Sequence, residues 1–394
     1  MNKTIRRMMI LALALMMCFA MIPTAGAIHA STTGGATAAM IDVNLIMDRG
    51  APIPQPTFAY TLTADAVTNP AFPLFNGILT GVKIGKQNAL QNATTYSLAF
   101  TQTSATAGLP SDATGTTTDG KQYVTEQLSI DFSGVTTFTE PGVYRYVLTE
   151  TQPDSPFALY TGETGIRYID VYVEYANDAA TDLTIQGIVT STANNVTAGD
   201  PNGGTNTADI QSKDTKINNE YTTYDLTLQK FVSGNQASQN QHFDFSVTVT
   251  NPATPAGTAY PNSYTVTKTC LDNNVTNPAT ITAGASATFH LKTGESIVIS
   301  NLPAGATYTI VETSSGYVTT AKVGGAAHTD DDTNDDTFTV KDTTGINADT
   351  TVVFTNARSG IIPTGVLLTI APFAVLMIVG LIGVLVIMRK RHNK

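Results

Sequence analysis

The sequence contains no tryptophan and only two cysteines among its 394 residues. Cys18 lies inside an apolar stretch near the N-terminus, so a chain that has lost this stretch keeps Cys270 alone. A single thiol cannot close a disulfide within the chain. If the exported protein needs a covalent cross-link, that cross-link must therefore use other side-chain chemistry.

Charged residues are also scarce, at 13%, and the basic ones are placed unevenly. Seven of the 21 lysines and arginines lie in residues 1–7 and 389–394, where there is no acidic residue. The rest of the chain carries 14 basic and 31 acidic residues, a formal net charge of −17. Such an acidic body repels nucleic acid and anionic lipid, which argues against both as partners.

Residue types that build enzyme and metal sites are sparse as well. Between the two ends, the only histidines are His242, His290 and His328, with no metal-ligand spacing and no phosphate-binding loop. The aspartates of residues 330–336 lack the glycine and the distant glutamate of an EF-hand loop, so we interpret them as a solvated hairpin loop. The sequence therefore predicts no metal, no cofactor and no enzymatic turnover.

Residues 1–30 have the pattern of a secretory signal peptide. Lys3, Arg6 and Arg7 precede an apolar run over residues 8–22, and small residues follow it. This run is short for a membrane anchor and ends in a cleavage-site pattern. We expect cleavage after Ala27 or Ala30 and export of the remaining chain.

The C-terminal end is typical of a cell-wall anchor. Residues 366–388 carry no charge and are numerous enough to cross a bilayer as a helix, and the basic tail 389–394 would stay in the cytoplasm. Just before them, in residues 358–365, stand Ile361, Ile362, Pro363, Thr364 and Gly365. This segment resembles a sortase sorting signal of the Val-Pro-Thr-Gly kind. The resemblance implies a dedicated sortase that cleaves after Thr364 and passes its carbonyl group to an amine.

The body of the chain contains the same landmarks twice. Each copy has an aromatic early strand, a turn followed by an aromatic strand that ends in glutamate, and a late apolar strand that carries asparagine. These landmarks are residues 57–62, 144–150 and 217–221 in the first copy, and 242–247, 308–312 and 352–356 in the second. Short strands divided by such turns predict an all-β chain with two tandem β-sandwich domains, residues 37–221 and 222–357.

Three polar residues of the second copy share their strand faces with apolar residues. Alternate residues of a strand point to the same side, so these three side chains are expected to point into the core. They are Lys230, Glu312 and Asn356. Because an inward lysine or glutamate without a partner is costly, we expect the three to meet.

The chemistry that fits this trio is spontaneous isopeptide formation. Burial lowers the pKa of Lys230 and raises that of Glu312, since desolvation disfavours both charged forms. The neutral amine can then attack the side-chain carbonyl of Asn356, while protonated Glu312 polarises that carbonyl and moves protons. Ammonia leaves, and the reaction occurs once per chain.

Together, residues 225–235, the strand that ends in Glu312, the strand that carries Asn356 and the Pro-Thr-Gly anchor resemble the shaft pilins of the streptococcal T-antigen type. The resemblance covers nearly the whole chain. It implies immunoglobulin-like (Cna-B-like) sandwiches, each tied between its first and last strands by a Lys–Asn isopeptide with a catalytic Glu.

The first copy departs from this pattern. Glu150 and Asn219 are in phase with apolar neighbours, but the expected first strand, residues 41–45, has Val43 or Leu45 where the lysine should stand. We therefore predict no isopeptide in the first domain, with Glu150 and Asn219 as a neutral, hydrogen-bonded remnant. Replacement amines would have to be Lys83, Lys86 or Lys121, if the fold brought one inward.

The resemblance also implies an acceptor amine shortly before the asparagine-bearing strand of the first domain. Lys213 and Lys216 are the candidates, and Lys213 is preferred. The favoured function is a structural pilus or fimbrial subunit at the cell wall, covalently polymerised or wall-anchored by a sortase, with neighbouring subunits or peptidoglycan as partners. The alternative is a monomeric wall-anchored adhesin for a host protein or glycan. In both cases the precursor meets the membrane only through its C-terminal anchor.

Overall fold

The fold was analysed in a computed structural model, which describes fourteen stretches of the chain. These are residues 37–64, 94–111, 113, 120–132, 142–151, 154–176, 183–192, 214–253, 259–269, 276–313, 316–334, 336–360, 375–382 and 384. The signal peptide, the sorting motif 361–365, the basic tail and Lys83, Lys86 and Lys213 lie outside them. Within the described residues, no helix combines the length and apolar character needed to cross a membrane.

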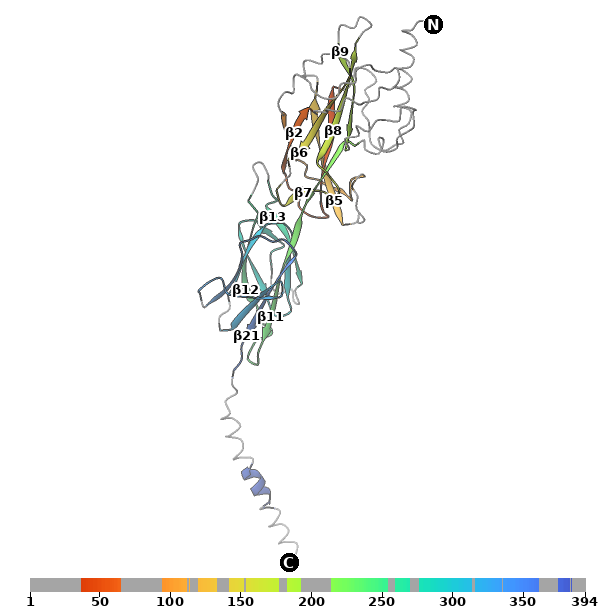
Figure 1. Cartoon of the computed structure of the whole chain (residues 1–394). Coiled ribbons are helices and arrows are strands. Elements are labelled where there is room, and N and C mark those ends of the chain that lie inside the picture. The colour runs from red at the N-terminus through yellow and green to blue at the C-terminus, as the bar shows by residue number, and fades with distance from the viewer. Residues whose placement is uncertain are drawn as a thin grey trace, which may run out of the picture.

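The regular secondary structure of the described residues is almost entirely β-strand, as predicted, and the strands form four sheets that pack in two pairs (Figure 1). The first sandwich contains ten strands: β1 (Ala38–Asp48), β2 (Thr57–Ala64), β3 (Thr94–Ala99), β4 (Thr106–Ala107), β5 (Lys121–Asp131), β6 (Gly142–Glu150), β7 (Phe157–Leu159), β8 (Ile166–Tyr175), β9 (Leu183–Ser191) and β10 (Lys216–Tyr221). Their order is β4-β5-β1-β10-β7 in one sheet and β3-β2-β6-β8-β9 in the other.

The second sandwich contains the remaining strands. They are β11 (Thr223–Ser233), β12 (Phe243–Thr250), β13 (Ser263–Thr269), β14 (Thr280–Thr282), β15 (Ser286–Leu291), β16 (Ser296–Pro303), β17 (Thr307–Thr313), β18 (Val318–Val323), β19 (Ala326–His328), β20 (Thr337–Asp342) and β21 (Thr350–Ala357). One sheet has the order β14-β13-β16-β11-β21-β18-β19, and the facing sheet has the order β15-β12-β17-β20. The first and last long strands, β11 and β21, are parallel neighbours.

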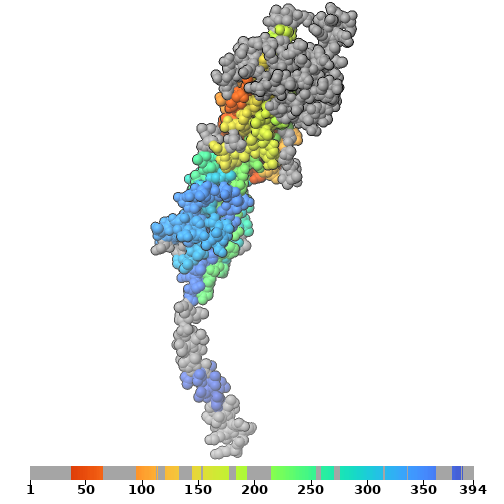
Figure 2. Space-filling view, viewed as in Figure 1, coloured from red at the N-terminus to blue at the C-terminus, as the bar shows by residue number. Residues whose placement is uncertain are grey.

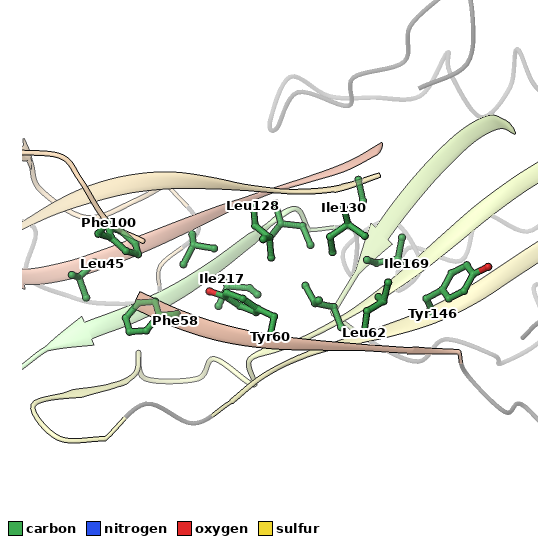
Figure 3. Close-up of a cluster of buried hydrophobic side chains, with 14 of the residues drawn as sticks. Leu45, Phe58, Tyr60, Leu62, Phe100, Leu128, Ile130, Tyr146, Ile169 and Ile217 are labelled. Atoms are coloured by element: carbon green, nitrogen blue, oxygen red, sulfur yellow. The ribbon is translucent and has the colours of Figure 1, made fainter. Parts of the chain in front are cut away.

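Alternation of apolar and polar residues explains why these segments form sandwiches. In β2, Phe58, Tyr60 and Leu62 are buried, while the residues between them are partly or fully exposed. Figure 3 shows these side chains pointing from β2 towards those of the facing sheet, such as Leu45 and Leu128. A strand with this period of two buries one face against the opposite sheet and leaves the other towards solvent.

The two sandwiches lie end to end along one axis, and in the space-filling view they form a single rod (Figures 1 and 2). Thr222 is the single residue between β10 and β11, so one nearly continuous strand passes from one sandwich to the other. Gln55 and Ala259 pair across the junction through two backbone hydrogen bonds of 2.9 and 3.0 Å. Tyr260 adds its ring to the core of the first sandwich, where it stacks on Phe157 at 6.2 Å between ring centres.

Candidate functional site

The interior of the second sandwich contains a lysine that reaches no solvent. Lys230 lies in β11 between the buried Leu228 and Val232, so strand alternation turns its side chain into the core. Glu312 of β17 and Asn356 of β21 are also buried, and all three side chains are 0% exposed. The structure therefore brings the three predicted polar residues into one interior.

Glu312 is the centre of this site. Its Oε1 atom lies 2.6 Å from the Nζ atom of Lys230 and accepts a hydrogen bond of 2.8 Å from Nδ2 of Asn356. The register of the parallel strands β11 and β21 explains why Lys230 and Asn356 meet, because Lys230 lies opposite Phe354, two residues before Asn356. Glu312 reaches the pair from the facing sheet. We call Lys230, Glu312 and Asn356 the buried triad.

Aromatic rings enclose the buried triad. The Nζ atom of Lys230 lies 4.1 Å from the ring centre of Phe243 and 5.7 Å from that of Phe245. Phe245 in turn packs edge to face on Phe354, with ring centres 5.2 Å apart. The rings can stabilise a cation through their faces, but they also exclude water, which favours neutral side chains.

Burial shifts the two ionisable groups of the triad in opposite directions. It lowers the pKa of Lys230 to about 8, although the neighbouring Glu312 opposes this shift. Burial raises the pKa of Glu312, against the opposing effects of Lys230 and Asn356. Both shifts favour the neutral amine and the neutral acid, which is the protonation state that a nucleophilic lysine needs.

One detail of the triad differs from the sequence-based expectation. We expected the acid of Glu312 to polarise the Asn356 carbonyl, but Glu312 contacts the amide nitrogen of that side chain instead. The carbonyl oxygen Oδ1 of Asn356 is buried and has no hydrogen-bond partner among the described residues. In this arrangement Oε1 of Glu312 is placed to exchange a proton with the amide nitrogen of Asn356.

The first sandwich contains a similar pair without a lysine. Nδ2 of Asn219 donates a hydrogen bond of 3.3 Å to Oε2 of Glu150, and both residues are buried. Leu45 lies opposite Asn219 in the parallel pair of β1 and β10, and Val43 lies two residues earlier. In the second sandwich, Val232 lies opposite Asn356, and Lys230 lies two residues before Val232. Val43, rather than Leu45, therefore occupies the position of the lysine.

The substitute amine that the structure describes does not reach this pair. Lys121 binds Asp48 at 3.0 Å and Glu220 at 2.9 Å, in a partly exposed ion-pair cluster. Its strand neighbour is Asp48 at the end of β1, several residues from Val43. The other two candidate lysines lie outside the described residues.

Sequence reasoning missed a buried arginine close to the Glu150 site. Arg167 of β8 is 0% exposed and pairs with Glu163 at 2.9 Å and Asp214 at 3.1 Å. Its positive charge opposes the rise in the pKa of Glu150, which burial nevertheless brings to about 7. Arg167 shares its strand face with the buried Ile169, and this alternation is the sequence signal that could have revealed it.

Of the two candidate acceptor lysines, the structure describes Lys216. It begins β10 next to Asp42 of β1, and its Nζ atom lies 2.8 Å from Oγ of Ser111. Its side chain is partly exposed, as a substrate amine requires.

Comparison with known proteins places this geometry in context. The chain is 26% identical over 375 residues to a protein named "Pilin" from Streptococcus pyogenes serotype M1, with 93% of this chain and 94% of the relative covered. The chain resembles a streptococcal pilin almost from end to end. A family model described as a domain of unknown function, DUF7601, matches residues 224–358, which correspond to the second sandwich.

Solved pilin structures share the fold. The major pilin of S. pyogenes is 23% identical, covers 84% of this chain and 100% of its own, and has a TM-score of 0.59. The major pilin T3.2 from S. pyogenes serotype GAS13637 is 22% identical, with coverages of 82% and 99% and a TM-score of 0.54. The pilin-like arrangement of tandem sandwiches is thus a property of this chain, as the motifs predicted.

Proposed function

We propose that the chain is a structural subunit of a bacterial surface pilus. The proposal is supported by a pilin relative that matches nearly the full length of the chain and by the shared fold. Residues 1–30 would direct export and be removed after Ala27 or Ala30. Residues 37–221 and 222–357 would form the two extracellular domains, and residues 366–394 would hold the precursor in the membrane until a sortase cuts after Thr364.

We further infer that the second domain cross-links itself. The observation that carries this inference is the contact of Lys230 and Asn356 with one carboxylate oxygen of Glu312, in an interior where none of the three side chains is exposed. Burying these polar groups is costly unless they are paired, and the three have the chemical roles of nucleophile, proton carrier and electrophile.

The reaction begins when the ammonium of Lys230 gives a proton to the carboxylate of Glu312. The free amine attacks Cγ of Asn356, an Nζ–Cγ bond forms, and the carbonyl electron pair moves to Oδ1. Glu312 then gives its proton to the Asn356 amide nitrogen and takes one from Nζ. Finally the Cγ–Nδ2 bond breaks, the carbonyl re-forms and ammonia leaves. Glu312 is then protonated, as it was when the amine attacked.

The position of this bond suits a fibre under tension. β11 and β21 are the first and last long strands of the second sandwich and lie side by side. A pull that enters near Arg358 would pass through Asn356 directly to Lys230, so the strands between them would carry little load. In the first domain, Val43 replaces the nucleophile, and we propose that Glu150 and Asn219 form a hydrogen-bonded pair without a covalent bond.

Polymerisation requires an amine on the next subunit. We propose Lys213, with Lys216 as the second candidate, because both shortly precede Asn219 in the chain. Attachment of the last subunit to peptidoglycan would use the same Thr364 carbonyl.

Two measurements test the proposal together. Intact-mass spectrometry of the full-length chain should show the loss of one ammonia, about 17 Da, from nucleophilic displacement at Asn356. Boiled wall extracts of the producing cells should show a ladder of covalent multimers that disappears in a Thr364→Ala variant. A full sequence mass would refute the cross-link, and a single monomer band would refute the polymer.

A further inference from the structure

Three buried side-chain oxygens in this region have no hydrogen-bond partner among the described residues. One is Oε2 of Glu312, and the other two are Oδ1 of Asn356 and the hydroxyl oxygen Oγ1 of Thr319. Each is a cost to folding, because a buried polar group normally exchanges its bonds to water for bonds within the protein.

The two residues lie directly opposite each other. Thr319 of β18 pairs with Asn356 of β21 in the antiparallel ladder. Thr319 also shares its strand face with the buried Ala321, so its side chain points to the same interior as Asn356. Directly opposed residues have Cβ atoms about 4.5–5.5 Å apart. No hydrogen bond joins the two oxygens in the resting chain, and a turn of the Thr319 side chain about its Cα–Cβ bond is the motion that would bring them together.

The proposed cross-linking reaction calls for a hydrogen-bond donor near Oδ1 of Asn356. When Lys230 attacks Cγ, negative charge develops on Oδ1 of Asn356 in an apolar interior. The Oε1 atom of Glu312 is engaged at the opposite end of the amide, where it accepts the hydrogen bond from Nδ2. Hydrogen-bond donors aimed at the atom where charge develops are a major source of catalysis in acyl-transfer reactions.

We propose that Thr319 is a further catalytic residue of the cross-linking reaction, whose hydroxyl donates a hydrogen bond to Oδ1 of Asn356 as the oxyanion forms. This role rests on the proposed isopeptide chemistry of the buried triad. It also explains the unpaired hydroxyl, since a donor that is used only in the transition state need not be bonded in the resting chain.

The test is the rate of cross-linking in newly made protein. The full-length chain is synthesised in a cell-free system, sampled over time, and its intact mass is followed until ammonia is lost. Thr319→Val keeps the side-chain volume and removes the hydroxyl, and we expect it to slow the reaction by about 100-fold, the usual effect of losing one oxyanion donor. Thr319→Ser should react at nearly the wild-type rate.

The matched control is Thr320→Val, which removes an exposed hydroxyl from the next position of the same strand. It should leave the rate unchanged. Circular dichroism reports whether each variant folds, and if Thr319→Val does not, the rates of Thr319→Ser and Thr319→Ala are compared instead. Wild-type protein that never loses ammonia would refute the cross-link itself. Wild-type protein that reacts no faster than a folded variant without the hydroxyl would refute the role of Thr319 alone.

Discussion

Lys230 and Glu312 meet at 2.6 Å in the core of the second sandwich, where neither side chain is exposed to solvent. As a charged pair they would carry the full cost of desolvation, and such pairs add little to stability compared with apolar residues. As a neutral amine beside a neutral acid they are ready to react. Burial lowers the pKa of Lys230 and raises that of Glu312, and both shifts disfavour the charged pair.

Glu312→Gln should stop the cross-link. The amide has nearly the shape of the acid but cannot take a proton from Lys230, so the variant should retain its full sequence mass. The second domain should also lose at least about 4–5 kcal/mol of unfolding free energy, by the chain-entropy estimate for closing a long loop. Intact mass and urea denaturation measure the two effects.

The control for this variant is Glu150→Gln, which makes the same change in the first sandwich. Because no lysine reaches Asn219 there, the ammonia loss of the chain should be the same as in the wild type. A Glu312→Gln chain that still loses ammonia would show that the carboxylate is dispensable.

Glu150 should make the first sandwich less stable as the pH rises. Burial raises its pKa in the folded chain to about 7, above the value of about 4.3 expected in an unfolded chain. The folded state therefore binds the proton of Glu150 more tightly than the unfolded state does. The stability that this proton contributes is complete below pH ~4.3 and is lost as the pH rises towards 7. Urea denaturation of the first sandwich between pH 4 and 8 should show this decline, and Glu150→Gln should flatten it.

Tyr260 should make the stability of the first sandwich depend on the presence of the second. Its ring packs on Phe157 in the core of the first sandwich, although its backbone belongs to the second. Tyr260→Ala should lower the unfolding free energy of the first sandwich by about 3 kcal/mol, in the range for truncating a buried aromatic ring.

Tyr260→Phe is the control for the junction. The Tyr260 hydroxyl has no hydrogen-bond partner among the described residues, so its removal should be close to neutral. If Tyr260→Ala is also neutral for the first sandwich, the ring does not join the two domains. Separate urea transitions of the two sandwiches provide the measurement.

Much of this architecture follows from alternation along single strands. The pattern of β11 is enough to turn Lys230 inward, and the landmarks that recur in β17 and β21 add Glu312 and Asn356. Register between strands is different, because it depends on pairing across long stretches of chain. The choice between Val43 and Leu45 was therefore open in the sequence and is decided by the pairing of β1 with β10.

Other features depend on three-dimensional contacts that no single strand encodes. The orientation of the Asn356 amide follows from its contact with Glu312, and the position of Thr319 follows from the β18–β21 register. Tyr260 enters a core other than that of its own domain because the two sandwiches meet at Gln55 and Ala259. Arg167 could have been recognised from its strand face, but its partners Glu163 and Asp214 come from separate loops.

Val43→Lys should give the first sandwich a cross-link of its own. The substitution places an amine where Lys230 stands in the second sandwich, beside the Glu150 carboxyl group and the Asn219 amide that are already in contact. The nearby charge of Arg167 disfavours a second cation and so helps to keep the new amine neutral. A folded Val43→Lys chain should therefore lose one more ammonia than the wild type.

Leu45→Lys is the matched control for this gain. It places the same side chain on the same strand face, but directly opposite Asn219 instead of two residues before it. If register decides the reaction, Leu45→Lys should show only the wild-type loss of ammonia. An additional ammonia lost by both folded variants would mean that proximity to Glu150, and not the β1–β10 register, controls the chemistry. A folded Val43→Lys chain with no additional loss would mean that the first sandwich lacks more than its nucleophile.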